Sequence, residues 1–187
     1  MKKSFIALTM AAVLALSVLL TACGGSTAPS EQASAKDYAQ IIFDNRNAEM
    51  NEYLDIMSNG EDGGYKFMAG YSDEYDDEMK QMNGDMMLEM VGLTAEDMDQ
   101  YAISMSLMMT QVYTIAIVKP AEGKDEAVQA ALQNLIQTQQ AAQEHYLQDQ
   151  YEIAKDARLT KAADGSWVLV MTDTATEDND AILAALK

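Results

Sequence analysis

The sequence is poor in the residues that usually carry covalent chemistry. Its 187 residues include one cysteine, one histidine and one tryptophan. A single cysteine excludes any disulfide within the chain. The one histidine, His145, falls in a predicted helix, and no Gly-x-Ser-x-Gly segment or Gly-rich phosphate loop accompanies it. We therefore predict that the protein is not an enzyme, that it has no catalytic residues and that it holds no cofactor.

Basic residues are scarce as well. Twelve Lys and Arg stand against thirty Asp and Glu, which gives a formal net charge of −18 at pH 7. A surface this acidic repels nucleic acid and anionic lipid headgroups, so we expect no nucleic-acid partner. Cations and basic partners remain open.

The first residues are predicted to form an export signal. Lys2 and Lys3 precede an apolar run from Phe5 to Leu20, which is too short to be a comfortable membrane span. The run ends in Leu20-Thr21-Ala22-Cys23, which resembles the lipobox of bacterial lipoproteins. That resemblance implies that residues 1–22 are removed and that Cys23 carries a diacylglyceryl anchor. We therefore expect a protein tethered to the extracytoplasmic face of the cell membrane, with the membrane as a partner through this lipid.

Composition divides the remaining chain into three parts. Residues 23–35 are small and polar, as in a flexible tether. Residues 36–92 form a helical, acidic, methionine-rich segment, with a helix predicted from Lys36 to Met57 and an accessory strand from Tyr65 to Tyr71. A second helix follows in this segment, and Asn83-Gly84 is expected to break it.

Residues 93–187 are predicted to form an α+β domain. The pattern predicts the following elements, in order: strands at 101–107 and 112–118, a helix at 124–147, strands at 158–162 and 166–172, and a helix at 174–186. This β-β-α-β-β-α order favours a two-layer fold. We expect a four-stranded, mainly antiparallel sheet with helices on one face and the N-terminal helical segment beside it.

Several segments resemble one family. They are Cys23 in its lipobox, the strand Ile115-Ala116-Ile117-Val118 followed by Lys119, and the run from Leu147 to Glu152. Together they resemble the bacterial lipoproteins grouped as family 4358 of domains of unknown function, over about Leu93 to Leu186. The resemblance implies the same fold and location. It implies no activity, ligand or catalytic residue.

An acidic run is the first candidate for metal binding. It contains Asp73, Glu74, Asp76, Asp77 and Glu78. A helix-loop-helix calcium site alternates its ligands and places a glycine at the sixth position and a glutamate at the twelfth, and this run does neither. We interpret the run as a solvated face, with an irregular calcium site as the alternative.

Methionines are the second candidate. The chain has fifteen, and all but Met1 and Met10 follow Cys23. Four of them, at steps of three or four residues, share one helical face: Met79, Met82, Met86 and Met90. We predict that this face packs in the core, because methionine is an adaptable core residue. The alternative is a copper(I) site of thioethers that also includes Met87.

Two functional hypotheses follow. The first is a non-catalytic binding or adaptor module for a protein, peptide or other envelope component. The second is a lipoprotein that binds a metal or small ligand, with calcium at the acidic face or copper(I) at the methionines.

Overall fold

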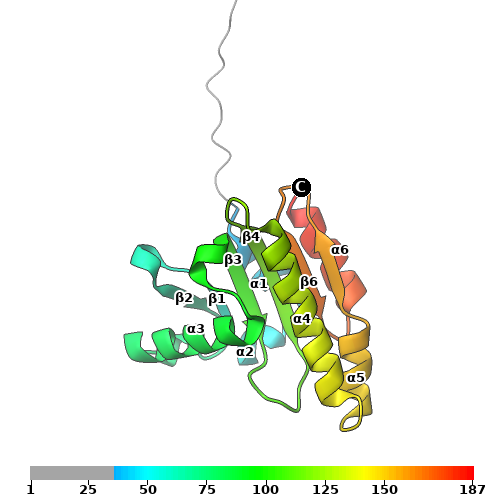
Figure 1. The fold of residues 1–187 in the computed structure, drawn as a ribbon. Helices are drawn as coiled ribbons and strands as arrows, with labels where there is room; N and C mark the ends of the chain where they lie inside the picture. The colour runs from blue at the N-terminus through cyan, green and yellow to red at the C-terminus, as the bar shows by residue number, and fades with distance from the viewer. Residues whose placement is uncertain (1–35) are drawn as a thin grey trace, which may run out of the picture. The chain divides into compact units, whose positions relative to one another are not determined.

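The structure, a computed structural model, describes residues 36–187, so the expected signal, the tether and Cys23 lie outside the described residues. A six-stranded sheet runs through the described chain in the order β2-β1-β3-β4-β6-β5, and every neighbouring pair is antiparallel (Figure 1). The strands are β1 (Ile56–Asn59), β2 (Tyr65–Met68), β3 (Met98–Met105), β4 (Thr114–Pro120), β5 (Arg158–Lys161) and β6 (Trp167–Met171). The α+β class and the antiparallel sheet are therefore confirmed, but the sheet has six strands and not four.

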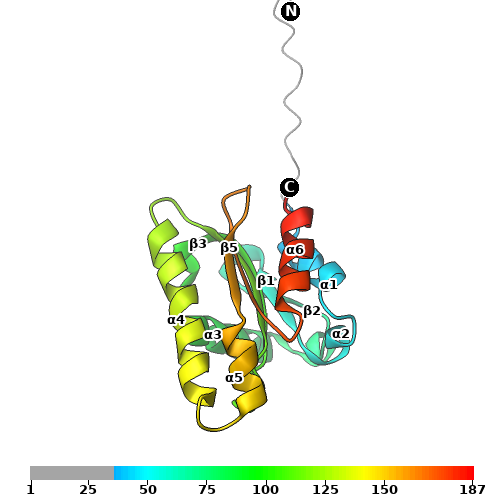
Figure 2. The same ribbon diagram turned by 90° about the vertical axis from the view of Figure 1, so that its right-hand side faces the viewer.

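The α-helices lie on both faces of this sheet. They are α1 (Tyr38–Asn45), α2 (Met50–Tyr53), α3 (Asp77–Val91), α4 (Asp125–Gln143), α5 (Gln148–Lys155) and α6 (Ala175–Ala185). Figure 2 shows the sheet nearly edge-on, with α3, α4 and α5 on one side and α1, α2 and α6 on the other. The predicted arrangement, with helices on one face, is wrong. The molecule has three layers.

The central strands explain the third layer. Every residue of β6, and β4 from Thr114 to Val118, is buried. On one face, Val118 and Leu169 pack with Leu132 of α4. On the other, alternate residues of the same strands pack with α1 and α6. Strands that are apolar on both faces need cover on both faces.

The segment around α1 and α2 departs from the predicted helix at 36–57. Helix α1 begins after Asp37, whose side chain accepts a hydrogen bond from the Gln40 backbone N–H at 3.1 Å. It ends at Asn45, and the chain then forms the single turn α2. Ile56 and Met57 are fully buried in β1, where Met57 pairs with Ile103 of β3. The apolar residues that suggested one long helix therefore belong to two different hydrophobic clusters, with Ile56 in one and Met57 in the other.

The hairpin of β1 and β2 extends the sheet on one side. Glu61–Gly63 forms the 3-10 turn between the strands, and Ile56 pairs with Met68. The accessory strand predicted at 65–71 is confirmed over Tyr65–Met68. This hairpin is the reason that the N-terminal part of the chain belongs to the sheet.

The elements after β3 follow the predicted order closely. The long helix ends at Gln143, and a separate helix, α5, occupies Gln148–Lys155. The two strands and the final helix lie within a few residues of their predicted bounds. In the described part of the chain, no helix combines the length and the hydropathy that a membrane crossing requires.

Helix α3 runs through Gly84 without a break, against the prediction. Gly84 is buried, and the ring of Tyr65 lies directly over it: a Cβ at this position would come within 2.2 Å of Tyr65 Cδ2. The glycine is thus a packing site where β2 meets α3. Helical hydrogen bonding continues because glycine costs a helix only about 1 kcal/mol relative to alanine.

This contact predicts the effect of Gly84→Ala. Helix propensity alone favours alanine, but the new methyl group would overlap the Tyr65 ring, so we expect the free energy of unfolding to fall by about 1–3 kcal/mol. Urea denaturation measures it. In a Tyr65→Ala background the same substitution should become neutral or stabilising. Stabilisation of the otherwise unchanged protein by Gly84→Ala would contradict the packing.

Candidate functional site

Cys23 and His145 are two residues that the sequence singled out. Cys23 lies outside the described residues. His145 lies in the turn between α4 and α5, where its side chain is 91% exposed and its Nε2 is 4.0 Å from Glu144 Oε2. An exposed histidine in a turn resembles a surface residue more than a catalytic base, which is usually held in place by its surroundings.

The acidic run lies at the N-terminus of α3 and caps this helix. Asp76 is the N-cap, and its Oδ1 accepts a hydrogen bond from the Met79 backbone N–H at 2.8 Å. Asp77 and Glu78 follow in the first turn, where negative charge is favoured by the helix dipole. All five acidic side chains of the run are exposed. Among the side chains that the structure describes, no three His, Cys, Asp or Glu residues are grouped as a metal site would require.

The methionines of α3 do not form the predicted core. Their exposed fractions are 38% for Met79, 59% for Met82, 38% for Met86 and 37% for Met90. The buried face of the helix is Gly84, Met87, Leu88 and Val91. Two rows of apolar residues share the helical period in this sequence. Only the tertiary structure shows which row faces β1 to β3.

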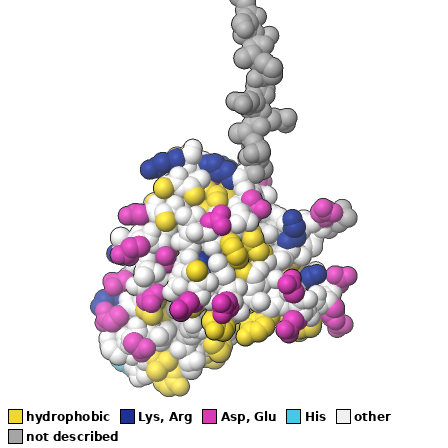
Figure 3. Space-filling view, turned by 180° about the vertical axis from the view of Figure 1, so that it is seen from behind, with side chains coloured by type: hydrophobic (Ala, Val, Ile, Leu, Met, Phe, Trp, Pro, Cys, Tyr) yellow, Lys and Arg dark blue, Asp and Glu magenta, His cyan; other side chains and the backbone are white. Residues whose placement is uncertain are grey.

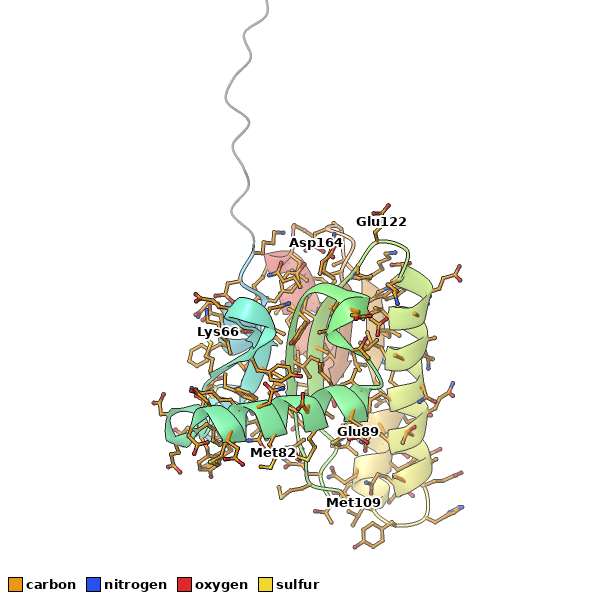
Figure 4. All side chains as sticks on the ribbon, turned by 60° about the vertical axis from the view of Figure 1, so that its left-hand side comes forward. Lys66, Met82, Glu89, Met109, Glu122 and Asp164 are labelled. Carbon is orange, nitrogen blue, oxygen red and sulfur yellow. The ribbon has the colours of Figure 1, made fainter. Side chains whose placement is uncertain are left out.

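At one end of the exposed methionine row, Met90 lines a small hollow together with three other exposed apolar residues. Leu107, Met108 and Met109 follow β3 and are 39%, 61% and 87% exposed. In Figure 4, Met82, Glu89 and Met109 lie toward one end of the molecule, and Glu122 and Asp164 lie at the opposite end. The space-filling view shows apolar side chains at that same lower end, with Asp and Glu around them (Figure 3).

A recess of about 500 Å³ opens at this end, and we call it the apolar recess. It is lined by Met50, Tyr53, Leu54, Asp55, Tyr71, Tyr75, Met105, Ser106, Leu107, Met108 and Gln111. Its volume is within the range of about 300–1,000 Å³ that is usual for ligand pockets. The lining comes from α2, from the segment before α3 and from the loop between β3 and β4.

A buried arginine connects α2 and the residue after it to strand β3. The Arg46 guanidinium donates hydrogen bonds to Asn51 Oδ1 at 2.6 Å, to Ser104 Oγ at 2.6 Å and to the Leu54 carbonyl at 2.7 Å. Burial lowers the pKa of Arg46, and the neighbouring Tyr113 and Asp55 act in the opposite direction. Because all three partners are fixed by one planar group, the position of Leu54 relative to β3 is well defined.

Asp55 organises one wall of the apolar recess. Its carboxylate accepts hydrogen bonds from the Tyr71 backbone N–H at 2.8 Å and from the Tyr75 hydroxyl at 2.6 Å. Burial and this hydrogen bond raise the pKa of Tyr75. Gly70 has φ +55°, and a Cβ there would lie 2.4 Å from Asp55 Oδ1, so glycine is needed for the close approach.

The loop between β3 and β4 forms the other wall. The Ser106 hydroxyl donates to Gln111 Oε1 and accepts from the Met108 backbone N–H, each at 3.2 Å. From the helices beside it, Gln143 Nε2 donates to the Met109 carbonyl at 2.8 Å, and Gln150 Oε1 accepts from the Val112 backbone N–H at 2.7 Å. The loop is thus tied down while Met108 and Met109 remain exposed.

A smaller polar pocket adjoins the apolar recess and shares Met50 and Gln111 with it. The volume of this polar pocket is about 150 Å³, and its lining includes Asp173 and Asp178. The buried Asp178 carboxylate accepts hydrogen bonds from two threonine hydroxyls, at 2.7 and 2.9 Å. Tyr113 also lines the pocket, and burial raises its pKa to about 12 against the opposing effect of Arg46.

This arrangement offers both apolar and acidic groups to a ligand. Its apolar side chains can receive apolar groups of a ligand, and its carboxylates can receive cations or hydrogen-bond donors. The site could not be recognised from the sequence, because its parts come from three separate segments. The available signal was the run Leu107-Met108-Met109, because large apolar residues continue past the end of the predicted strand into the predicted loop.

The comparisons with known proteins place the chain in a family. Residues 71–172 match the model of the family described as Domain of unknown function (DUF4358), which is 102 of 187 residues. The chain therefore belongs to this family, as its sequence suggested. The match includes the 106–113 loop and α3. No curated protein and no solved structure matches the chain.

The observed packing of α3 reverses the expected effects of its methionines. Met87→Ala and Leu88→Ala should each lower the free energy of unfolding by about 2–5 kcal/mol, because both side chains are buried. Met82→Ala should change it by no more than about 0.5 kcal/mol. Chemical denaturation of the three variants measures the difference. A large loss for Met82→Ala would show that this face is covered.

Proposed function

We propose that this protein is a non-catalytic binding or adaptor module that recognises a protein or peptide partner at the apolar recess. One observation carries the proposal: exposed methionine, tyrosine and leucine side chains gather around a recess at one end of the molecule. Exposed apolar patches of this kind usually mark interaction sites. Methionine is suited to them, because its flexible side chain adapts to partners of different shape.

We propose further that the module is a lipoprotein tethered at the extracytoplasmic face of a bacterial cell membrane. The support is the sequence Leu20-Thr21-Ala22-Cys23 after a basic start and an apolar run. Two acyl chains on Cys23 would hold the protein at the membrane, since each buried methylene contributes about 0.8 kcal/mol. A tethered module would meet partners at or near the membrane surface.

The anchor is tested by Cys23→Ser. Thioether lipidation needs the sulfur, so the variant should leave the membrane fraction or accumulate as an unprocessed precursor. Cell fractionation and the mobility of the protein on a gel report both outcomes. If a species of mature size still fractionates with membranes, the lipoprotein assignment is wrong.

The binding function is tested by photo-crosslinking in cells. A photoreactive amino acid in place of Met108, which is 61% exposed beside the apolar recess, should yield a discrete crosslinked species identifiable by mass spectrometry. The matched control is the same amino acid in place of Glu122, an exposed residue at the opposite end (Figure 4). Equal crosslinking at both positions, or none at either, would contradict the proposal.

A second candidate function is copper(I) binding. The sequence favoured core packing for one row of methionines, but the structure leaves the row exposed, which makes their thioethers accessible to a metal ion: Met79, Met82, Met86 and Met90. Residues three and four apart on a helix have Cβ atoms about 5–6 Å apart, so their thioethers can converge on one soft cation. Chelator competition with copper(I) tests this function. Binding that Met82→Leu and Met86→Leu abolish would support it, and binding unchanged by both would exclude this row.

A further inference from the structure

The charges around the apolar recess point to the chemistry of its partner. We propose that the recess and the adjoining polar pocket bind a basic amphipathic segment of a partner protein. The apolar side chains of that segment would enter the recess, and its Lys or Arg side chains would lie against the carboxylates beside it. This inference rests on the proposed binding function and adds the chemical class of the ligand.

The apolar half of the proposed surface is open to solvent. Tyr53 is 57% exposed, Tyr71 51% and Leu107 39%. All three line the apolar recess together with Met108. An amphipathic helix presents apolar residues at intervals of three and four, and such helices commonly bind in grooves lined by adaptable side chains. The recess therefore suits a short row of apolar side chains better than one compact ligand.

The charged half is acidic. Asp55 in the apolar recess, and Asp173 and Asp178 in the polar pocket, are the only charged side chains among the described residues that line these two hollows. None of the ion pairs formed within residues 36–187 involves any of the three. Asp173 is thus the exposed carboxylate of these two hollows without an ion-pair partner in the described chain, whereas Asp178 is buried and the charge of Asp55 acts on the nearby Arg46.

The acidic character continues beyond the polar pocket. A third hollow shares Ile153, Thr172 and Asp173 with the polar pocket. Asp156 and Glu177 also line it, together with Glu152, whose carboxylate forms an ion pair with Lys155 at 2.6 Å. Its one basic residue, Arg158, donates hydrogen bonds to the Asp156 carbonyl at 2.6 Å and to Thr176 Oγ1 at 3.2 Å. An apolar groove continuous with an acidic one matches a segment that has both apolar and basic residues.

The same charges disfavour two other occupants. A second copy of this chain would bring another strongly acidic surface to an acidic one, because the net charge of the chain is −18. Anionic lipid headgroups would be repelled in the same way. A basic peptide is attracted by the surface as a whole, so its association should also be fast and sensitive to salt.

Three synthetic peptides test the inference. Each has about fourteen residues, with leucine at helical intervals of three and four; the remaining positions are lysine in the first, glutamine in the second and glutamate in the third. The protein is the full chain in nanodiscs of zwitterionic phosphatidylcholine, with empty nanodiscs as the control for lipid binding. Titration calorimetry or fluorescence anisotropy gives each Kd.

We expect the lysine peptide to bind at least about tenfold more tightly than the glutamine peptide, and the glutamate peptide not to bind. Raising the salt concentration should reduce this difference. Equal affinity for the lysine and glutamine peptides would overturn the inference about charge and leave the proposed binding function intact. Binding to none of the peptides, or equal binding to empty nanodiscs, would also overturn it. The crosslinking at Met108 tests the binding function separately.

Three double variants locate the contacts. Asp173→Asn with Glu177→Gln removes two exposed carboxylates of the acidic hollows and should weaken the lysine peptide several-fold without affecting the glutamine peptide. Glu122→Gln with Glu126→Gln is the matched control and should have no effect, because neither residue lines these hollows. Leu107→Gln with Met108→Gln should weaken both peptides. Equal losses of affinity in the Asp173/Glu177 double variant and in the Glu122/Glu126 control would overturn the proposed location.

Discussion

Burial of the central sheet on both faces is the constraint on which the rest of the structure depends. Strands β4 and β6 carry apolar residues at successive positions, so neither face can be left to water. Helices α3, α4 and α5 cover one face, and α1 and α6 cover the other. The N-terminal part of the chain is therefore needed to complete the fold, both as cover and as the edge hairpin of β1 and β2.

The buried Arg46 connects this architecture to the candidate site. It spans from the end of α1 to Ser104 on β3 and to the Leu54 carbonyl, so the turn that follows α2 is fixed to the sheet. Removing one partner from such a network leaves a buried charge without compensation, which is costly. Asp55 then holds Tyr71 and Tyr75 in place by hydrogen bonds, and these polar contacts determine the shape of one wall of the apolar recess.

The placement of the methionines gives the molecule its most unusual surface. In α3 the core takes Met87, Leu88 and Val91, and four other methionines remain exposed. A soluble surface usually avoids contiguous apolar side chains unless they have a use. Met90, at one end of this row, lines a small hollow with Leu107, Met108 and Met109, and two of these residues also line the apolar recess.

The sequence by itself determined the elements whose pattern is local. The antiparallel strands, the long helix after Lys124 and the family were predictable, because alternation, helical period and turns depend on neighbouring residues. The uninterrupted apolar runs of β4 and β6 also indicated that both faces of the sheet are buried, although the prediction placed helices on one face only. The sequence still carries the only argument for lipidation at Cys23, which lies outside the described residues.

Only the tertiary structure decided the remainder. Ile56 and Met57 fit a helical period as well as a strand, and pairing with β3 selected the strand. Asn83-Gly84 was expected to break the helix, yet Gly84 lies within α3 because the ring of Tyr65 packs where a side chain would be. The apolar recess joins residues from 50 to 111, and its polar neighbour reaches Asp178. Contacts between distant segments form through packing, and no local pattern encodes which of two apolar rows will meet a partner.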